Sequence, residues 1–286
     1  MAIEGIKKVG VIGSGLMGSG IAQVVATAGY PVIFCDVSKG IVNKGYESIK
    51  KQLLKSVEKG KLSQNEMNHI LNLIVCTDEY NDLTDVDFIF EAVFENMNVK
   101  KELYAKIDSI CKESCIFASN TSGLSVTEIA AATERTDRFI GSHFFNPVPV
   151  MKLVEIIRGY DTSEVTYKVT KQLCGDIGKT TITVNEAPLF CVNRILIPML
   201  NEAMFVLSEG IATKEDIDTG MMLGTNQPIG PLALSDLIGL DTLMMVMETL
   251  YNETSDSKYR PCPILKKMVR AGKYGRKSGE GFYKYN

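Results

Sequence analysis

Hydrophobic residues in the first two thirds of the chain form short apolar runs, separated by longer stretches in which apolar residues recur every three or four positions. The short runs are typical of strands buried on both faces, and the longer stretches are typical of amphipathic helices. Because the two patterns alternate, we predict an α/β fold with a doubly wound sheet. The predicted strands are residues 8–12, 32–35, 73–76, 88–90, 116–119, 139–144, 151–157 and 180–184.

A helical hairpin is expected between the second and third strands, where the connection is longer than a usual crossover. Residues 39–60 have helical periodicity, and residues 63–66 (Ser-Gln-Asn-Glu) form a capping-box sequence that begins a second helix. Further on, Asn98 is expected to open a helix through residues 98–112, and residues 125–128 form a second capping-box sequence.

The pattern changes at Pro188, after which helical periodicity dominates. Residues 188–210 are expected to form one long apolar helix, and shorter helices follow. We therefore divide the chain into domains 1–188 and 189–286. Methionine fills irregular apolar gaps, so the methionines of the second domain are expected in its core or at a subunit interface. They are residues 221, 222, 244, 245 and 247.

A glycine-rich turn follows the first predicted strand. Its sequence, Gly13-Ser14-Gly15-Leu16-Met17-Gly18, has the spacing of a dinucleotide-binding turn. Gly13 permits the tight turn, Gly15 leaves room for a pyrophosphate, and Gly18 lets the next helix pack against the strand. The second strand ends at Asp36, where a carboxylate can bind a ribose hydroxyl. These features predict a Rossmann-like domain whose turn, including Leu16 and Met17, binds NAD.

Composition narrows the classes of partner. The chain has 286 residues, of which 45% are hydrophobic, and its formal net charge is −3. This charge gives no field that would collect nucleic acid or an anionic membrane, and no stretch approaches the roughly 20 apolar residues of a membrane span. The seven cysteines are odd in number and scattered, without paired C-x-x-C spacing. We therefore expect a cytoplasmic protein with a small-molecule partner and no metal site.

Polar residues gather where predicted strands end, and ligands of an open parallel sheet bind beyond the carboxyl ends of its strands. Glu95 and Lys100 follow strand 88–90 and could reach the nicotinamide half of the cofactor, although by position alone each is an ordinary exposed charge. His143 lies at the end of strand 139–144, where it is either a ligand-binding or a structural histidine. The residues expected at the cofactor from these strand ends are Ala92, Glu95, Lys100 and Asn120.

Three lysines of the predicted hairpin share one helix face. Lys51, Lys55 and Lys59 are spaced four residues apart. By itself, such a face is usually a solvated surface that supports the helix. The alternative is a binding site for an anionic ligand.

Three segments resemble the L-3-hydroxyacyl-CoA dehydrogenases. They are residues 119–122 (Ser-Asn-Thr-Ser), residues 143–155 (His-Phe-Phe-Asn-Pro-Val-Pro-Val-Met-Lys-Leu-Val-Glu) and residues 192–194 (Val-Asn-Arg). The His-Phe-Phe-Asn-Pro string is highly specific, and the resemblance extends over nearly the whole chain. Within the family, the bacterial 3-hydroxybutyryl-CoA dehydrogenases are the most similar type. The resemblance implies NAD-dependent oxidation of a hydroxyl group on an acyl-CoA.

The resemblance also assigns roles to residues. It implies that His143 is the catalytic base, because an imidazole can take the hydroxyl proton while hydride leaves for the nicotinamide. Glu155 would orient the ring and stabilise its protonated form. Ser122 and Asn193 would bind the substrate oxygens, and Lys55 and Lys59 the phosphates of coenzyme A. The resemblance further implies a homodimer joined through domain 189–286.

Two positions depart from the family pattern, and two other functions stay open. Leu189 stands where the family usually has glycine, and Gly123 where it often has serine. The other functions are a dehydrogenase of free 3-hydroxy acids and a non-catalytic, crystallin-like structural protein. The lysine face favours a CoA ester, whereas the presence of His143 and Glu155 argues against a structural protein.

Overall fold

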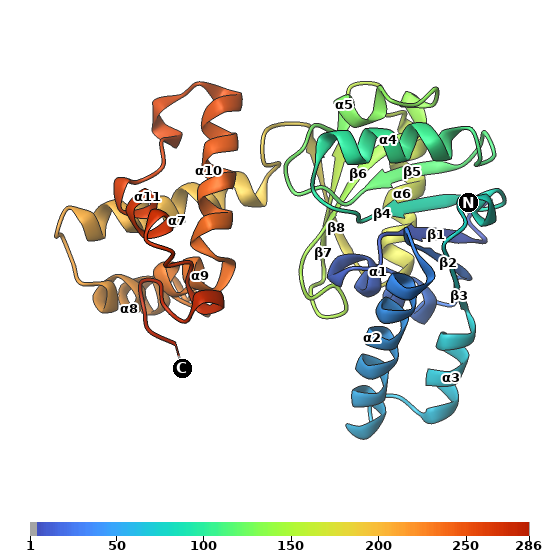
Figure 1. The fold of residues 1–286 in the computed structure, drawn as a ribbon, viewed down its shortest axis with the longest axis horizontal. Helices are drawn as coiled ribbons and strands as arrows, with labels where there is room; N and C mark the ends of the chain where they lie inside the picture. The colour runs from blue at the N-terminus through green and yellow to red at the C-terminus, as the bar shows by residue number, and fades with distance from the viewer. Residues whose placement is uncertain (1–4, 286) are drawn as a thin grey trace. The chain divides into compact units, whose positions relative to one another are not determined.

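The chain folds into two compact units in the computed structural model shown in Figure 1, which describes residues 5–285. The first unit ends at Ala187 and the second begins at Pro188. The first is built around a sheet and the second from helices.

The first unit contains one eight-stranded sheet in the order β3-β2-β1-β4-β5-β6-β7-β8. Its strands are β1 (Val9–Ile12), β2 (Val32–Cys35), β3 (Ile74–Thr77), β4 (Phe88–Glu91), β5 (Ile116–Ser119), β6 (Phe139–Phe144), β7 (Leu153–Arg158) and β8 (Thr180–Asn185). Neighbouring strands are parallel except at β6 and β7, which pair antiparallel. The predicted doubly wound α/β fold is confirmed. The reversal at β7 was not predicted, and it arises because residues 145–152 are too few for a crossover to a parallel neighbour.

Helices cover both faces of this sheet. They are α1 (Leu16–Thr27), α2 (Lys39–Glu58), α3 (Gln64–Asn72), α4 (Met97–Asp108), α5 (Val126–Ala130) and α6 (Glu164–Asp176). Helices α1, α2, α3 and α6 share one buried cluster with alternate strand residues, which include Ala118 and Ile140. Tyr104 of α4 packs against Phe117 and Phe139, with ring centroids 5.5 and 4.6 Å apart. Since adjacent strand residues point to opposite faces, α4 covers the face opposite to α1.

The helical hairpin is confirmed as α2 and α3, which extend beside the sheet in Figure 1. Ser63 Oγ accepts a bond from the backbone N–H of Glu66 at 3.2 Å, and the Glu66 carboxylate accepts one from the backbone N–H of Ser63 at 2.8 Å. Both halves of the predicted capping box are therefore made, and they fix the start of α3.

One predicted helix start and one predicted capping box need correction. Helix α4 begins at Met97 with Asn96 as its N-cap, not Asn98, and it ends at Asp108. At the start of α5, Ser125 accepts a bond from the backbone N–H of Glu128, but the Glu128 carboxylate accepts from Lys101 Nζ at 2.6 Å instead of closing the box. Contacts made by another helix thus replace the reciprocal half of the cap.

The second unit consists of helices around its own buried cluster. They are α7 (Val192–Ser208), α8 (Lys214–Thr225), α9 (Pro231–Ile238), α10 (Leu240–Thr254) and α11 (Pro263–Arg270). Helix α11 was not predicted, although Pro263 at its first position is a start signal. The four short 3₁₀ helices of the described chain are Tyr80–Leu83, Thr136–Arg138, Ser257–Tyr259 and Arg276–Ser278. The methionines that were expected in the core or at an interface differ in their burial. Met247 is buried in the cluster, whereas Met245 is 58% exposed.

The predicted single helix over residues 188–210 is shorter than expected, because α7 begins only at Val192. Leu189 and Phe190 have φ angles of +61° and +59°. These left-handed backbone conformations cannot continue a right-handed helix and are costly for residues other than glycine. The side chain of Leu189 is nevertheless buried in the cluster of the second unit, which compensates for this conformation.

A buried carboxylate anchors the glycine-rich tail of the second unit. Asp236 of α9 is 1% exposed and accepts bonds from the backbone N–H groups of Phe282 and Tyr283, each at 2.9 Å. It also accepts a bond from the Tyr285 hydroxyl at 3.0 Å. A Cβ atom at Gly281 would lie 2.0 Å from the Asp236 carboxylate, so only glycine fits there.

We expect Asp236→Ala to lower the free energy of unfolding by about 2–4 kcal/mol, because three donors lose a charged acceptor. The measurement is urea denaturation followed by circular dichroism. Glu253→Ala is the matched control, since Glu253 is an exposed acid on α10 and its loss should change stability by about 0.5 kcal/mol or less. Equal losses in the two variants would contradict the anchoring role.

Candidate active site

The glycine turn between β1 and α1 has the geometry of a phosphate-binding loop. Gly13 has a φ of +94°, and a Cβ atom there would lie 2.5 Å from the Ala92 carbonyl oxygen. A Cβ atom at Gly18 would lie 1.7 Å from the Gly13 carbonyl oxygen. At Gly15 no atom lies within 4 Å of the Cβ position, so the turn faces open space at the N-terminus of α1.

Asp36 is held against this turn. Its Oδ2 atom accepts bonds from the backbone N–H and the hydroxyl of Ser14, both at 2.6 Å, and its Oδ1 atom accepts from the backbone N–H of Val37 at 2.7 Å. Asp36 borders a pocket of about 670 Å³. The predicted cofactor residues that line this pocket are Gly13, Gly15, Leu16, Met17, Asp36 and Ala92. The pocket therefore has the open turn and the carboxylate that a dinucleotide needs.

His143, near the end of β6, and Glu155, near the start of β7, form a buried pair. They are direct partners in the antiparallel register, so their side chains lie on the same face. His143 Nδ1 lies 2.7 Å from Glu155 Oε2, and the two residues are 5% and 0% exposed. A carboxylate at this distance assigns the proton to Nδ1 and leaves Nε2 as the acceptor in the neutral ring.

Asn120 and Ser122 are positioned by bonds to neighbouring segments. Asn120 Oδ1 accepts a bond from the backbone N–H of Phe144 at 2.9 Å, which ties the end of β5 to the residue after His143. The backbone N–H of Ser122 donates to Glu95 Oε1 at 2.7 Å. Hydrogen bonds thus link Glu95, after β4, to Ser122, after β5, and Asn120 to the end of β6.

Lys100 differs from the expected exposed charge. Its side chain is 0% exposed, and its Nζ atom lies 2.6 Å from Glu91 Oε1 and 3.3 Å from Glu95 Oε2. The ammonium of Lys100 therefore lies beside Glu95, the other residue expected at the nicotinamide half of the cofactor. Sequence reasoning missed Glu91, whose signal is an acidic residue that directly continues the apolar run of β4.

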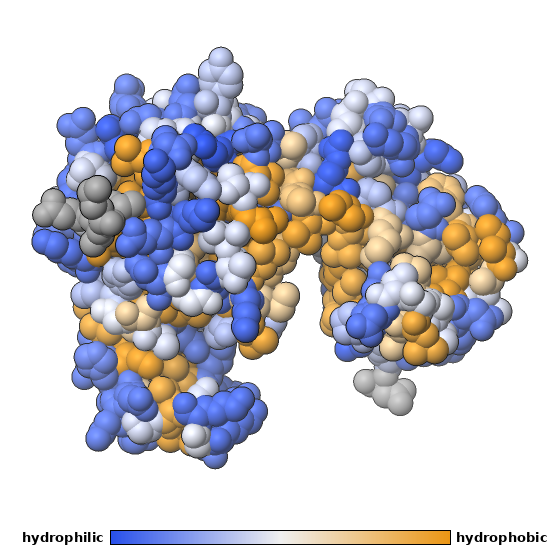
Figure 2. Space-filling view, turned by 180° about the vertical axis from the view of Figure 1, so that it is seen from behind, coloured by the Kyte–Doolittle hydropathy of each residue, from blue (hydrophilic) through white to orange (hydrophobic). Residues whose placement is uncertain are grey.

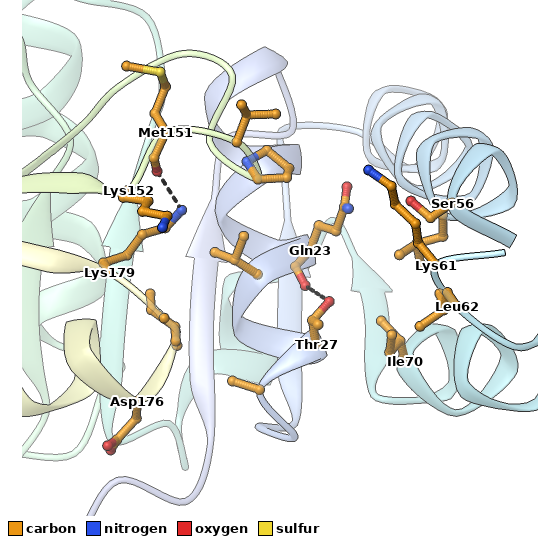
Figure 3. Close-up of a pocket in the computed structure, with 17 residues that line it drawn as sticks. Gln23, Thr27, Ser56, Lys61, Leu62, Ile70, Met151, Lys152, Asp176 and Lys179 are labelled. Atoms are coloured by element: carbon orange, nitrogen blue, oxygen red, sulfur yellow. Dashed lines mark hydrogen bonds between the residues drawn. The ribbon is translucent and has the colours of Figure 1, made fainter. Parts of the chain in front are cut away.

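A second pocket, of about 560 Å³, lies between α1, the helical hairpin and two loops (Figure 3). Ser56 and Lys61 border it from the hairpin, and Met151 and Lys152 border it from the connection between β6 and β7. Lys179 donates to the Met151 carbonyl oxygen at 2.9 Å, and burial lowers the pKa of this lysine. The predicted lysines 51 and 55 of α2, and Lys59 at its C-cap, are exposed on the same hairpin.

Asn193, the remaining predicted substrate residue, lies in the first turn of α7 in the second unit. Within residues 5–285, no cluster of His, Cys, Asp or Glu side chains could hold a metal ion. In the same part of the chain, no helix is both long enough and apolar enough to cross a membrane.

Comparisons with known proteins cover both units. The family model described as "3-hydroxyacyl-CoA dehydrogenase, NAD binding domain" matches residues 8–187, and "3-hydroxyacyl-CoA dehydrogenase, C-terminal domain" matches residues 190–285. The chain is 50% identical over 279 residues to a 3-hydroxybutyryl-CoA dehydrogenase of Clostridioides difficile, which covers 98% of this chain and 99% of that relative. It is 42% identical to the human mitochondrial hydroxyacyl-coenzyme A dehydrogenase, with 98% of this chain and 91% of the relative covered.

A solved structure agrees with these relatives. The (S)-3-hydroxybutyryl-CoA dehydrogenase of Ralstonia eutropha superimposes with a TM-score of 0.97 at 49% identity, over 99% of this chain and all of that one. The resemblance identified from the sequence is confirmed, as is the NAD-binding character of the first unit. The chain belongs to the 3-hydroxyacyl-CoA dehydrogenase family.

Proposed function

We propose that this protein is an NAD-dependent dehydrogenase that interconverts (S)-3-hydroxybutyryl-CoA and acetoacetyl-CoA. The observation that carries the proposal is the buried His143–Glu155 pair, in the same unit as a dinucleotide-binding turn. The relatives at about half identity bear the name of this activity, which supports the choice of substrate.

The proposed chemistry assigns one task to each residue. Bound NAD would supply the carbon that accepts or returns the hydride. His143 Nε2 accepts the proton of the substrate hydroxyl in oxidation and returns it in reduction, while Glu155 stabilises the protonated ring. Ser122 and Asn193 bind the substrate oxygens. Glu95 and Asn120, in the segments that follow β4 and β5, lie near the nicotinamide half of the cofactor, and the turn with Asp36 binds the adenosine half.

The hairpin favours a CoA ester over a free 3-hydroxy acid. Lys55 is an exposed cation on α2, and Lys59 is the exposed C-cap residue of this helix, whose Ser56 borders the second pocket. The opposite wall of that pocket includes Met151, from the connection that begins directly after β6 and His143. We therefore propose that the phosphates of coenzyme A bind near the hairpin. A free acid has no phosphate to bind these lysines, so acetoacetate and acetoacetyl-CoA should differ strongly as substrates.

The proposal also covers the role of the second unit, the cellular compartment and the metabolic role of the protein. We assign the second unit to substrate binding and dimerisation, and the protein to the cytoplasm and to fatty acid and butyrate metabolism. None of the seven cysteines, all within the described chain, is joined in a disulfide, which supports a reducing compartment. A crystallin-like structural role is the alternative, and any turnover of acetoacetyl-CoA would exclude it as the only function.

The cofactor preference follows from Asp36. Its carboxylate should accept bonds from the adenosine ribose and repel a 2′-phosphate, so kcat/KM should be about tenfold or more higher with NADH than with NADPH. The nearby cation, Lys39, already has a hydrogen-bond partner, because its Nζ atom donates to the Cys76 carbonyl oxygen at 2.8 Å. Steady-state kinetics with both cofactors test this, and equal or better values with NADPH would refute the assignment.

The coenzyme A site is tested by Lys55→Ala combined with Lys59→Ala. We expect KM for acetoacetyl-CoA to rise by about fivefold or more at low ionic strength and to depend less on salt, because screened contacts to phosphate are lost. Lys50→Ala is the matched control, since Lys50 is exposed on another side of the same helix. An unchanged KM at low salt would contradict phosphate binding and would mean that the two lysines are only a solvated helix surface.

The catalytic pair is tested by a double-mutant cycle with NADH and acetoacetyl-CoA. His143→Ala should lower kcat by about 10²- to 10⁴-fold and leave NADH affinity nearly intact. Glu155→Gln should cause a smaller loss, and the double variant should be little worse than His143→Ala alone. The other histidine, His69, is exposed on α3, so His69→Ala is the control. Additive losses, or near-normal turnover of His143→Ala, would break the assignment.

Dimerisation is supported by exposed apolar side chains on the second unit, whose surface carries several apolar areas in Figure 2. They include Ile195, Ile211, Leu223 and Met245, which are 67%, 68%, 82% and 58% exposed. Such side chains favour a partner surface. Light scattering should give twice the 31.5 kDa mass of the chain, and a monomer at micromolar concentration would contradict the proposal.

A further inference from the structure

A basic pocket of about 600 Å³ lies within the second unit, bordered by α10, α11 and the connection between them. None of its lining residues has a part in the proposed reaction. Its four cations are Arg260, Lys266, Lys267 and Arg270. Glu248 is the single carboxylate among the described residues that line it. We propose that this basic pocket binds an anion that carries a diphosphate group.

The four cations of the basic pocket have no carboxylate partner within residues 5–285, and α11 itself contains no acidic residue. Other lysines of the same unit, outside the pocket, do have such partners. Lys214, Lys258, Lys273 and Lys277 lie 3.9, 3.0, 2.7 and 2.5 Å from carboxylate oxygens. The positive charge of the pocket is therefore not neutralised by neighbouring side chains, and an anion can bind it.

The arrangement of these charges costs stability without a counter-ion. Lys266 and Arg270 are four residues apart in α11, so two like charges share one face of the helix and repel each other. Lys267 and Arg270 lie in the last turn, where the helix dipole favours cations, but Lys266 precedes that turn and Arg260 lies outside the helix. A bound anion would offset the repulsion at all four positions.

Arg260 is held by contacts that leave most of its donors available. Its Cζ atom lies 5.0 Å from the centroid of the Phe205 ring, a cation–π contact. Its Nη1 atom donates to the Ser257 carbonyl oxygen at 3.3 Å. These contacts limit the motion of the guanidinium, whose planar fork suits two oxygens of one phosphate group.

Charge and size indicate the class of ligand. Four cations and one carboxylate leave an excess of three positive charges, which favours an anion with several negative charges over a monocarboxylate. The volume is within the range of small-molecule sites, about 300–1,000 Å³. Tyr251 of α10, which is 40% exposed, also lines the pocket, and a base could stack on its ring. Inorganic pyrophosphate and a nucleoside diphosphate share the required chemistry.

The test is isothermal titration calorimetry with inorganic pyrophosphate, in saturating NADH so that the dinucleotide-binding turn is occupied. We expect a Kd of about 1 mM or lower at about 0.05 M salt, and weaker binding at about 0.3 M salt because the charges are screened. Lys266→Ala combined with Arg270→Ala should raise Kd by about fivefold or more. No binding by the wild type, or an equal Kd in this variant, would overturn the proposal.

Replacing the carboxylate should have the opposite effect. Glu248→Gln removes a negative charge from the lining and should lower Kd by about twofold or more, whereas a higher Kd would contradict an anion site here. Lys258→Ala combined with Lys284→Ala is the matched control, because both lysines are exposed on the same unit and neither lines the pocket. A fivefold rise in Kd for this control would mean that only net charge matters, and would refute a specific site.

Two further measurements identify the source of the diphosphate and its place of binding. ADP that binds more tightly than pyrophosphate, and loses this advantage in Tyr251→Ala, would identify a nucleoside diphosphate; equal binding of the two would identify the diphosphate group alone. Lys55→Ala combined with Lys59→Ala should leave Kd unchanged, and a loss there instead would assign pyrophosphate to the helical hairpin and reject the proposal.

The basic pocket and the proposed dehydrogenase function can fail separately. Acetoacetyl-CoA turnover by Lys266→Ala combined with Arg270→Ala should equal that of the wild type, which also shows that the variant folds. Absence of pyrophosphate binding in an active wild-type enzyme would refute the basic pocket alone. Wild-type protein that binds pyrophosphate but does not reduce acetoacetyl-CoA would refute the proposed function alone.

Discussion

The antiparallel pairing of β6 with β7 is the constraint on which the candidate site depends. Direct partners across antiparallel strands point to the same face, so the register that opposes His143 to Glu155 also brings their side chains within hydrogen-bonding distance. The short connection between these strands forces the reversal, and β8 then pairs parallel with β7. A one-residue slip of β7 would turn Glu155 to the other face of the sheet.

Carboxylates at or near the ends of elements accept backbone hydrogen bonds in both units. Glu91 joins β4 to β5, Asp36 joins β2 to the glycine turn, and Asp236 joins α9 to the tail. Each accepts backbone N–H groups that have no partner in a helix or strand, and a charged acceptor makes such bonds stronger. In the first unit these acceptors lie at the edge where the cofactor pocket opens. The same contacts that complete the fold therefore also place the groups proposed to act on the substrate.

The connection between the units shows how a departure from the family pattern is accommodated. Leu189 occupies a left-handed conformation at the position where the family usually has glycine. The cost of that conformation for a branched side chain is of order 1 kcal/mol. The side chain of Leu189 is 2% exposed, and burial of a leucine is worth about 1.5–3 kcal/mol. Packing in the second unit is therefore sufficient to keep leucine there.

The sequence by itself determined the elements whose signals are local. The glycine turn, the hairpin with its capping box, the order of strands and helices, and the family string that begins at His143 were all readable from neighbouring residues. Tertiary structure alone decided the pairing register that opposes Glu155 to His143, the burial of Lys100 and the N-terminal start of α7 at Val192. These features depend on residues distant in the chain, because strand register, the pairing of buried charges and the packing of a left-handed turn are set by what each segment meets in space.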